Sequence, residues 1–211
     1  MSTATTLGFA HVHIPPHAES TDKHTMLLLH GTGGAEHDLL DLGAKVAPDM
    51  RLLGVRGQVL ESGMPRFFRR LAEGVFDEDD IVRRAADLAA FIRTAAETYG
   101  FDATKVVALG YSNGANIAAA LMLLHPGTLS GAALLRAMLP LVPPVLPSLA
   151  GTPVLMAEGV LDPIIPRANT ERLAALLAEC GAEVTVNWEP TGHGITPADV
   201  AVTQRWMSGL R

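Results

Sequence analysis

The sequence has only one cysteine, few aromatic residues and no long apolar run. With one cysteine in 211 residues no internal disulfide can form, so we expect a protein of the reducing cytoplasm, with Cys180 as a buried structural thiol. No apolar run reaches the roughly 18 residues of a membrane-spanning helix, so we expect no stable membrane insertion. The first residues lack a basic segment followed by an apolar one, so we also expect no secretory signal.

The sequence also has no excess of basic residues over acidic ones. The formal net charge is −6, which argues against nucleic acid and anionic membrane surfaces as partners. His11 and His13 would share one face of a strand, but two ligands without a nearby third make a weak metal site. We therefore expect no metal and no organic cofactor.

What the sequence does contain is a regular alternation of strand-like and helix-like segments. Apolar residues make up 48% of the chain, as a sheet covered on both faces requires. The alternation predicts one α/β domain over residues 1–211, with a mostly parallel central sheet and helices on both faces. Strands are expected near 9–14, 25–29, 51–55, 104–109, 131–135, 152–157 and 183–188, and helices near 37–46, 78–99, 115–125, 169–180 and 197–210.

The most informative motif is Gly-Tyr-Ser-Asn-Gly at 110–114, between a predicted strand and a predicted helix. A serine at such a corner is typical of a nucleophile elbow, because the tight turn lifts its hydroxyl clear of the sheet. The flanking glycines let other backbone approach without a clash. We predict Ser112 as a catalytic nucleophile; the alternative is a glycine-rich structural turn.

A serine hydroxyl needs a base and a group that orients the base. Among eight histidines only His193 lies late in the chain in a tight polar loop, flanked by glycines. The acid should lie between serine and histidine in chain order. Asp162 follows a predicted strand in a loop stiffened by two prolines, and Glu158 is the competing carboxylate.

A second glycine-rich loop, His-Gly-Thr-Gly-Gly at 30–34, follows the buried strand at 25–29. It lacks the Gly-Lys-Ser/Thr ending of a phosphate-binding P-loop. We predict that the backbone N–H groups of Thr32 and Asn113 form an oxyanion hole; the alternative is a flexible turn. His30 is expected to pack under the loop through hydrogen bonds.

With these motifs in this order, the chain resembles the phospholipase/carboxylesterase group of small α/β-hydrolases, which includes the acyl-protein thioesterases and related bacterial esterases. The resemblance runs from about residue 25 to the C-terminus and also includes Arg-Gly at 56–57 and Gly-Val-Leu-Asp at 159–162. It implies an α/β-hydrolase fold, a triad of Ser112, Asp162 and His193, and a homodimer. No segment is long enough for a separate lid domain, which favours an open site and small, short-chain or aryl esters.

The segment 59–76 follows a strand end and should border the catalytic edge. We predict an apolar substrate pocket lined by Met64, Phe67, Phe68, Phe76 and Met138. The alternative is a surface helix with a core face. Arg66, Arg69 and Arg70 either attract an anionic substrate or form a solvated face paired with nearby acids.

The sequence thus predicts a serine carboxylesterase acting on a small-molecule ester. The competing functions are an acyl thioesterase or lysophospholipase and a non-catalytic binding protein of the same fold.

Overall fold

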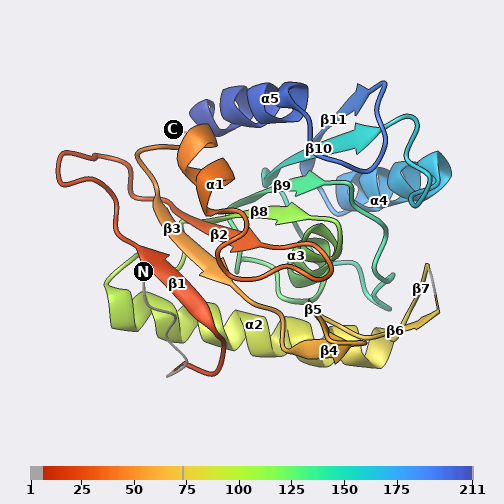
Figure 1. Cartoon of the computed structure of the whole chain (residues 1–211), viewed down its shortest axis with the longest axis horizontal. Coiled ribbons are helices and arrows are strands. Elements are labelled where there is room, and N and C mark those ends of the chain that lie inside the picture. Colours follow the sequence, from red (N-terminus) through yellow and green to blue (C-terminus); the bar gives the residue numbers. More distant parts are fainter. Residues whose placement is uncertain (1–6, 73, 211) are drawn as a thin grey trace.

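The computed structural model describes residues 7–72 and 74–210, which fold around one large central sheet (Figure 1). In spatial order its seven strands are β1 (His11–Ile14), β3 (Arg51–Val55), β2 (Thr25–Leu29), β8 (Val106–Tyr111), β9 (Gly131–Leu135), β10 (Pro153–Gly159) and β11 (Glu183–Glu189). Only the pairing of β1 with β3 is antiparallel, whereas all other neighbours in this sheet run parallel. The prediction of a mostly parallel sheet is confirmed.

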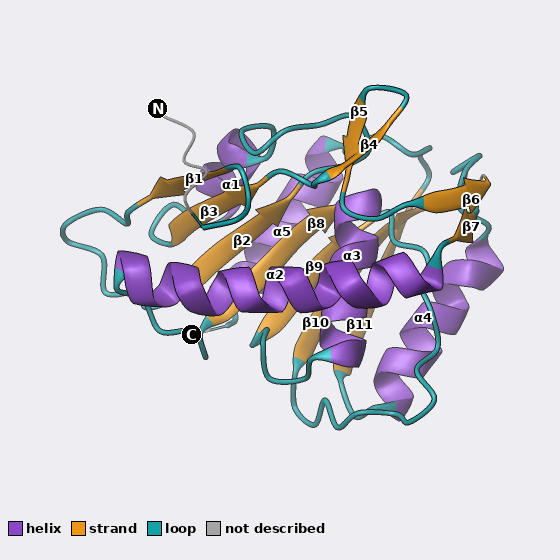
Figure 2. Ribbon diagram, turned by 90° about the horizontal axis from the view of Figure 1, so that it is seen from below, coloured by secondary structure: helices purple, strands orange, loops and turns teal. Residues whose placement is uncertain are grey.

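Helices cover both faces of the sheet. On one face lie α1 (Leu40–Val46) and α5 (Pro197–Ser208), and on the other α2 (Glu78–Tyr99), α3 (Asn113–Leu124) and α4 (Arg167–Glu179) (Figures 1 and 2). The side chain of Asp77 caps α2 by accepting a hydrogen bond from the Asp80 N–H at 3.0 Å. Within the described ranges no helix is both long and apolar enough to span a bilayer.

The alternating side chains of each strand fill two separate cores. In β2, Leu27 and Leu29 point into the core under α2 and α3, while Met26 and Leu28 point into the core under α1 and α5. Because each residue of β2 is buried on one face or the other, the four residues that follow Thr25 are all apolar. This explains why its sequence shows no apolar–polar alternation.

The parallel arrangement brings several loops to one edge of the sheet. β2, β8, β9, β10 and β11 are consecutive neighbours, so the loops at their carboxyl ends are adjacent. Ligands of open α/β sheets bind at this edge. Thr32, Ser112, Met138, Asp162 and His193 all lie in or directly after these loops.

The segment between β3 and α2 contains two short hairpins. The first pairs β4 (Val59–Glu61) with β5 (Met64–Arg66), and the second pairs β6 (Arg70–Ala72) with β7 (Val75–Phe76). The surface helix considered as an alternative for this segment is therefore wrong. Ser62 and Gly63, with φ of 52° and 80°, form a left-handed turn that interrupts any helix, and Pro65 follows directly.

Candidate active site

Ser112 occupies a strained turn between β8 and α3. Its φ is 52° and its ψ is −115°, a conformation that L-residues rarely adopt. The neighbouring glycines make the turn possible: a Cβ on Gly110 would lie 2.6 Å from the Gly114 oxygen, and one on Gly114 would lie 1.9 Å from the Leu29 oxygen. The Ser112 N–H donates to the Leu135 oxygen at 2.8 Å, which ties the turn to β9.

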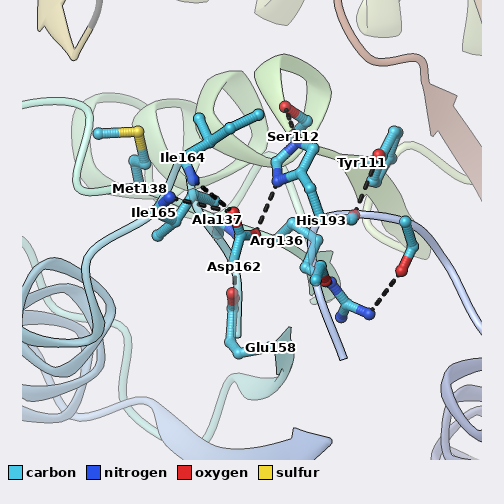
Figure 3. Close-up of polar contacts among 12 residues, drawn as sticks. Tyr111, Ser112, Arg136, Ala137, Met138, Glu158, Asp162, Ile164, Ile165 and His193 are labelled. Atoms are coloured by element: carbon cyan, nitrogen blue, oxygen red, sulfur yellow. Dashed lines mark hydrogen bonds and ion pairs between the residues drawn. The ribbon is translucent and has the colours of Figure 1, made fainter. Parts of the chain in front are cut away.

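His193 and Asp162 complete a hydrogen-bonded chain that starts at Ser112 (Figure 3). The Nε2 atom of His193 lies 3.0 Å from Ser112 Oγ, and its Nδ1 atom lies 2.7 Å from Asp162 Oδ2. The ring is therefore placed to take a proton from the hydroxyl on one side while the carboxylate faces its other nitrogen. The structure thus brings together the three residues that the motifs singled out.

Both oxygens of the Asp162 carboxylate have partners. While Oδ2 faces His193, Oδ1 accepts hydrogen bonds from the N–H groups of Ile164 and Ile165 at 2.8 and 3.1 Å. The side chain is only 2% exposed. A buried carboxylate fixed at both oxygens holds the imidazole in one orientation and one tautomer.

Arg136 holds the loop that carries His193. It directly follows β9, has a φ of 56° and is completely buried. Arg136 donates to the backbone oxygens on both sides of His193 and forms a buried bidentate ion pair with Asp199 at the start of α5. All five of its N–H groups are used. The acceptors are Gly192 O at 3.1 Å, Gly194 O at 2.8 Å, Ala157 O at 2.7 Å, and Asp199 Oδ1 and Oδ2 at 3.0 and 2.6 Å.

Tyr111 supports the same loop from the other side. Its hydroxyl donates to the His193 backbone oxygen at 3.1 Å, and the centroids of the two rings are 5.4 Å apart. Burial raises the pKa of the Tyr111 phenol, so the hydroxyl remains a donor. The Tyr111 ring also lies against Gly31, where an added Cβ would be 2.8 Å away.

Glu158, the competing acid, does not contact His193. Its Oε1 accepts a hydrogen bond from the Ala137 N–H at 2.9 Å, beneath Asp162 (Figure 3). Burial raises the pKa of Glu158 to about 8. It is therefore a neutral, buried acceptor near neutral pH.

Thr32 and Asn113, the predicted oxyanion donors, both border the cavity in front of Ser112. Within the described residues neither backbone N–H donates to a protein acceptor. The Asn113 side chain accepts a hydrogen bond from the Phe67 N–H at 2.7 Å, which joins the elbow to the hairpin segment.

His30 links the loop after β2 to the loop after β3. The Gly57 N–H donates to His30 Nε2 at 3.0 Å, and His30 Nδ1 lies 2.6 Å from the Gly31 oxygen. Burial lowers the pKa of His30. The expected packing position of His30 under the loop is confirmed.

A cavity of about 240 Å³ opens in front of Ser112. Phe76 and Met138 line it, together with several residues that the motifs did not indicate. The full lining is Thr32, Arg66, Arg70, Gly74, Phe76, Tyr111, Ser112, Asn113, Asn116, Met138, Ile164 and His193.

Three residues of the predicted pocket lie elsewhere. Phe67 and Phe68 are 2% and 0% exposed and belong to the core under α2 and α3, so their assignment to the pocket is wrong. Met64 is 41% exposed at the first hairpin and does not line the cavity. The sequence gives no periodicity across these short hairpins, so it cannot indicate which phenylalanines turn inward.

The sequence carried only weak signals for the other lining residues. Asn116 lies one helical turn after Ser112, and Ile164 lies two residues after Asp162. Their spacing from the motif residues places them on the cavity side, but an asparagine and an isoleucine do not by themselves indicate a catalytic or binding role. Among the described residues no group of three or more potential metal ligands occurs, and His11 instead contacts the Phe9 oxygen and Tyr99 hydroxyl.

Comparison with known proteins agrees with this geometry. The sequence model of one family, phospholipase/carboxylesterase, matches residues 16–208. MhqD of Bacillus subtilis (strain 168) is 48% identical over 188 residues, which cover 89% of this chain and 94% of MhqD. A Bacillus cereus carboxylesterase structure matches with a TM-score of 0.94 at 45% identity, covering 98% of this chain and 97% of that one. A Mesorhizobium loti carboxylesterase matches with a TM-score of 0.90 at 34% identity, covering 99% and 98%.

Replacing Arg136 should destabilise the protein strongly. Arg136→Met leaves the Asp199 carboxylate buried and without its cation, so we expect a loss of about 3–5 kcal/mol in the free energy of unfolding. Urea unfolding followed by circular dichroism measures this. The control is Arg83→Met, which removes a guanidinium that is 66% exposed and paired with Asp80; we expect a loss of at most about 1 kcal/mol there. Equal losses in both variants would contradict the assigned role of the buried pair.

The buried Glu158 should make stability depend on pH. Because the folded-state pKa of about 8 lies above the ordinary 4.5, the native state binds this proton more tightly than the unfolded chain. The contribution of Glu158 to stability therefore falls as the pH rises from about 4.5 to about 8.

Glu158→Gln removes that dependence. The free energy of unfolding of the variant minus that of the parent should increase from about pH 4.5 to about pH 8. The increase should be at most about 1.4 kcal/mol per pH unit. Urea unfolding at pH 5, 6, 7 and 8 measures the difference, and Glu97→Gln on the exposed face of α2 is the control for the same substitution at the surface. A constant difference between variant and parent would contradict the buried, neutral state of Glu158.

Proposed function

The chain belongs to the phospholipase/carboxylesterase family, and we propose that it is a serine hydrolase that cleaves carboxylic esters through an acyl-enzyme. One observation carries the proposal: Ser112 Oγ, the His193 ring and the Asp162 carboxylate form a continuous chain of 3.0 and 2.7 Å contacts. The Ser112 hydroxyl borders an open cavity that a substrate can reach.

In the first half of the reaction, His193 Nε2 removes the proton of Ser112 as Oγ attacks the ester carbonyl carbon. Asp162 stabilises the imidazolium that forms. His193 then gives the proton to the leaving alcohol oxygen as the carbon–oxygen bond breaks, which leaves an acyl group on Ser112. In the second half, water takes the place of the alcohol and the acid is released.

The negative charge of each tetrahedral intermediate falls on the former carbonyl oxygen. We assign its stabilisation to the backbone N–H groups of Thr32 and Asn113, which have no protein acceptor within the described residues. Asn113 also begins α3, where the helix dipole favours negative charge. Because these donors are already fixed in position, they need little reorganisation as the charge develops.

The cavity supports short-chain or aryl esters as substrates. Its volume of about 240 Å³ lies below the range that accommodates drug-sized ligands. Two solved structures similar to this chain are carboxylesterases. A thioesterase or lysophospholipase acting on long acyl chains is the second candidate, and a non-catalytic binding protein is the third.

Replacing the nucleophile tests the mechanism. Ser112→Ala should lower kcat for 4-nitrophenyl acetate by up to about 10⁶-fold, because the covalent route is lost. The parent protein should be labelled by a fluorophosphonate probe and the variant should not. Ser208→Ala, at an exposed serine of α5, is the control and should keep both activity and labelling. Labelling at a residue other than Ser112, or a Ser112→Ala variant that keeps more than a few per cent of the parent's rate with contamination excluded, would refute the assignment.

A series of 4-nitrophenyl esters tests the substrate class. We expect kcat/KM to be highest for acetate to butyrate and to fall beyond them, because longer chains extend outside the small cavity. Steady-state rates from acetate to palmitate, with palmitoyl thioester alongside, provide the comparison. A maximum at palmitate or at the thioester would favour the second candidate function instead.

A further inference from the structure

Two of the three clustered arginines line the cavity of the proposed nucleophile. Arg66 and Arg70 border the same space as Ser112 and His193. Arg69 does not: its guanidinium pairs with Asp77 and is 59% exposed. A pocket that only received an apolar ester would have no use for two cations beside the nucleophile.

Arg66 is held rigidly. It is 4% exposed, its Nη1 donates to Thr32 Oγ1 at 2.7 Å, and its Nε donates to the Phe68 oxygen at 3.3 Å. Its remaining nitrogen, Nη2, makes no hydrogen bond to any described residue. The side chain thus spans the loop after β2 and the hairpin segment while keeping one donor group unused.

Arg70 has still more unused capacity. Its Nε donates to Glu61 Oε1 at 2.6 Å, and within residues 7–72 and 74–210 its Nη1 and Nη2 make no hydrogen bond. Glu61 Oε2 lies 3.3 Å from Arg66 Nε, so one carboxylate lies between the two guanidinium groups. The three side chains together keep one net positive charge at the cavity.

Asn116 adds a further donor to the cavity wall. Asn116 Oδ1 accepts a hydrogen bond from the Met138 N–H at 2.7 Å, which leaves the Asn116 NH₂ group without a described partner. No carboxylate is among the described lining residues. The remaining wall is apolar and includes Phe76, Met138 and Ile164. The cavity therefore combines several hydrogen-bond donors and positive charge with apolar side chains, and Phe76 is the cross-strand neighbour of Arg70.

We propose that the substrate of this site is a small ester that carries a carboxylate, bound by the free nitrogens of Arg70 and Arg66. A guanidinium with two free terminal nitrogens matches the two oxygens of a carboxylate. Glu61 contacts the Nε atoms of both arginines and so holds them in place. This inference rests on the proposed hydrolase function, because it concerns the substrate of the same site.

Matched pairs of esters test the proposal. On the acyl side the pair is mono-(4-nitrophenyl) glutarate and 4-nitrophenyl pentanoate, which differ in a terminal carboxylate. On the alcohol side the pair is 4-acetoxybenzoate and phenyl acetate. For each pair we define the charge preference as kcat/KM of the anionic ester divided by that of the neutral ester. Comparing this ratio between proteins cancels the intrinsic reactivity of each ester.

In Arg70→Gln the charge preference should fall about 10- to 100-fold for at least one pair, the effect of losing charge-assisted hydrogen bonds. Arg69→Gln is the matched control, since it removes the same charge one residue away; its charge preference should stay within about twofold of the parent. Arg70→Lys should restore only part of the preference, because lysine cannot form the bidentate contact. An unchanged ratio in Arg70→Gln for both pairs, or an equal fall in Arg69→Gln, would overturn the proposal.

Binding to an inactive variant separates this proposal from the hydrolase function itself. Glutarate titrated into Ser112→Ala by calorimetry should bind, and should bind at least about 10-fold more weakly when Arg70→Gln is added. If no ester is hydrolysed but this difference is found, the hydrolase function fails while the anion site stands. If esters are hydrolysed but glutarate binds equally to both variants, the anion site is wrong and the hydrolase function stands.

Discussion

The buried pair of Arg136 and Asp199 is the interaction on which the site depends. A fully desolvated guanidinium is costly unless every donor is used, and here all five N–H groups have acceptors. Those acceptors belong to β10, to α5 and to the backbone on both sides of His193. One side chain thus fixes the loop that carries His193 to the central sheet and to the C-terminal helix. Asp199 also completes the capping box of α5 with Thr196, so the same carboxylate serves the helix start and the loop.

The fold and the triad geometry could be foreseen because their signals are local and strong. The bounds of α2 and of strands β2, β3 and β9 agree with the sequence prediction. A capping residue, a glycine or a charged residue marks the ends of each of these elements. Residues 110 and 114 must be glycines because an added Cβ would lie only 2.6 and 1.9 Å from backbone oxygens, and this requirement is visible in the sequence as a motif. Loops at the carboxyl ends of parallel strands lie at one edge of a sheet. Because Ser112, Asp162 and His193 each follow such a strand, their places in the sequence already indicate that they meet.

The substrate pocket was less predictable because short hairpins carry little periodicity. Over residues 59–76 each strand has at most three residues, too few to distinguish an inward from an outward face. Phe67 lies in the core against the His30 ring, with centroids 4.8 Å apart, and its position depends on the Asn113 side chain far away in the sequence. Arg136 gave no sequence signal either, because an arginine after a strand is ordinarily a surface residue. Its burial follows from acceptors that only the tertiary fold assembles.

The charged and polar groups around Ser112 are arranged on two sides of the site. Behind His193 lie the acids: Asp162, buried and accepting from two backbone N–H groups, and the neutral Glu158 beneath it. In front of Ser112 lie the donors of Thr32, Asn113, Asn116 and the two arginines. Negative charge that stabilises an imidazolium is thereby kept away from the position where an oxyanion would form. A carboxylate in front of the serine would oppose that oxyanion, and none is among the described residues that line the cavity. Glu61 lies behind that lining, where it is paired with both guanidinium groups.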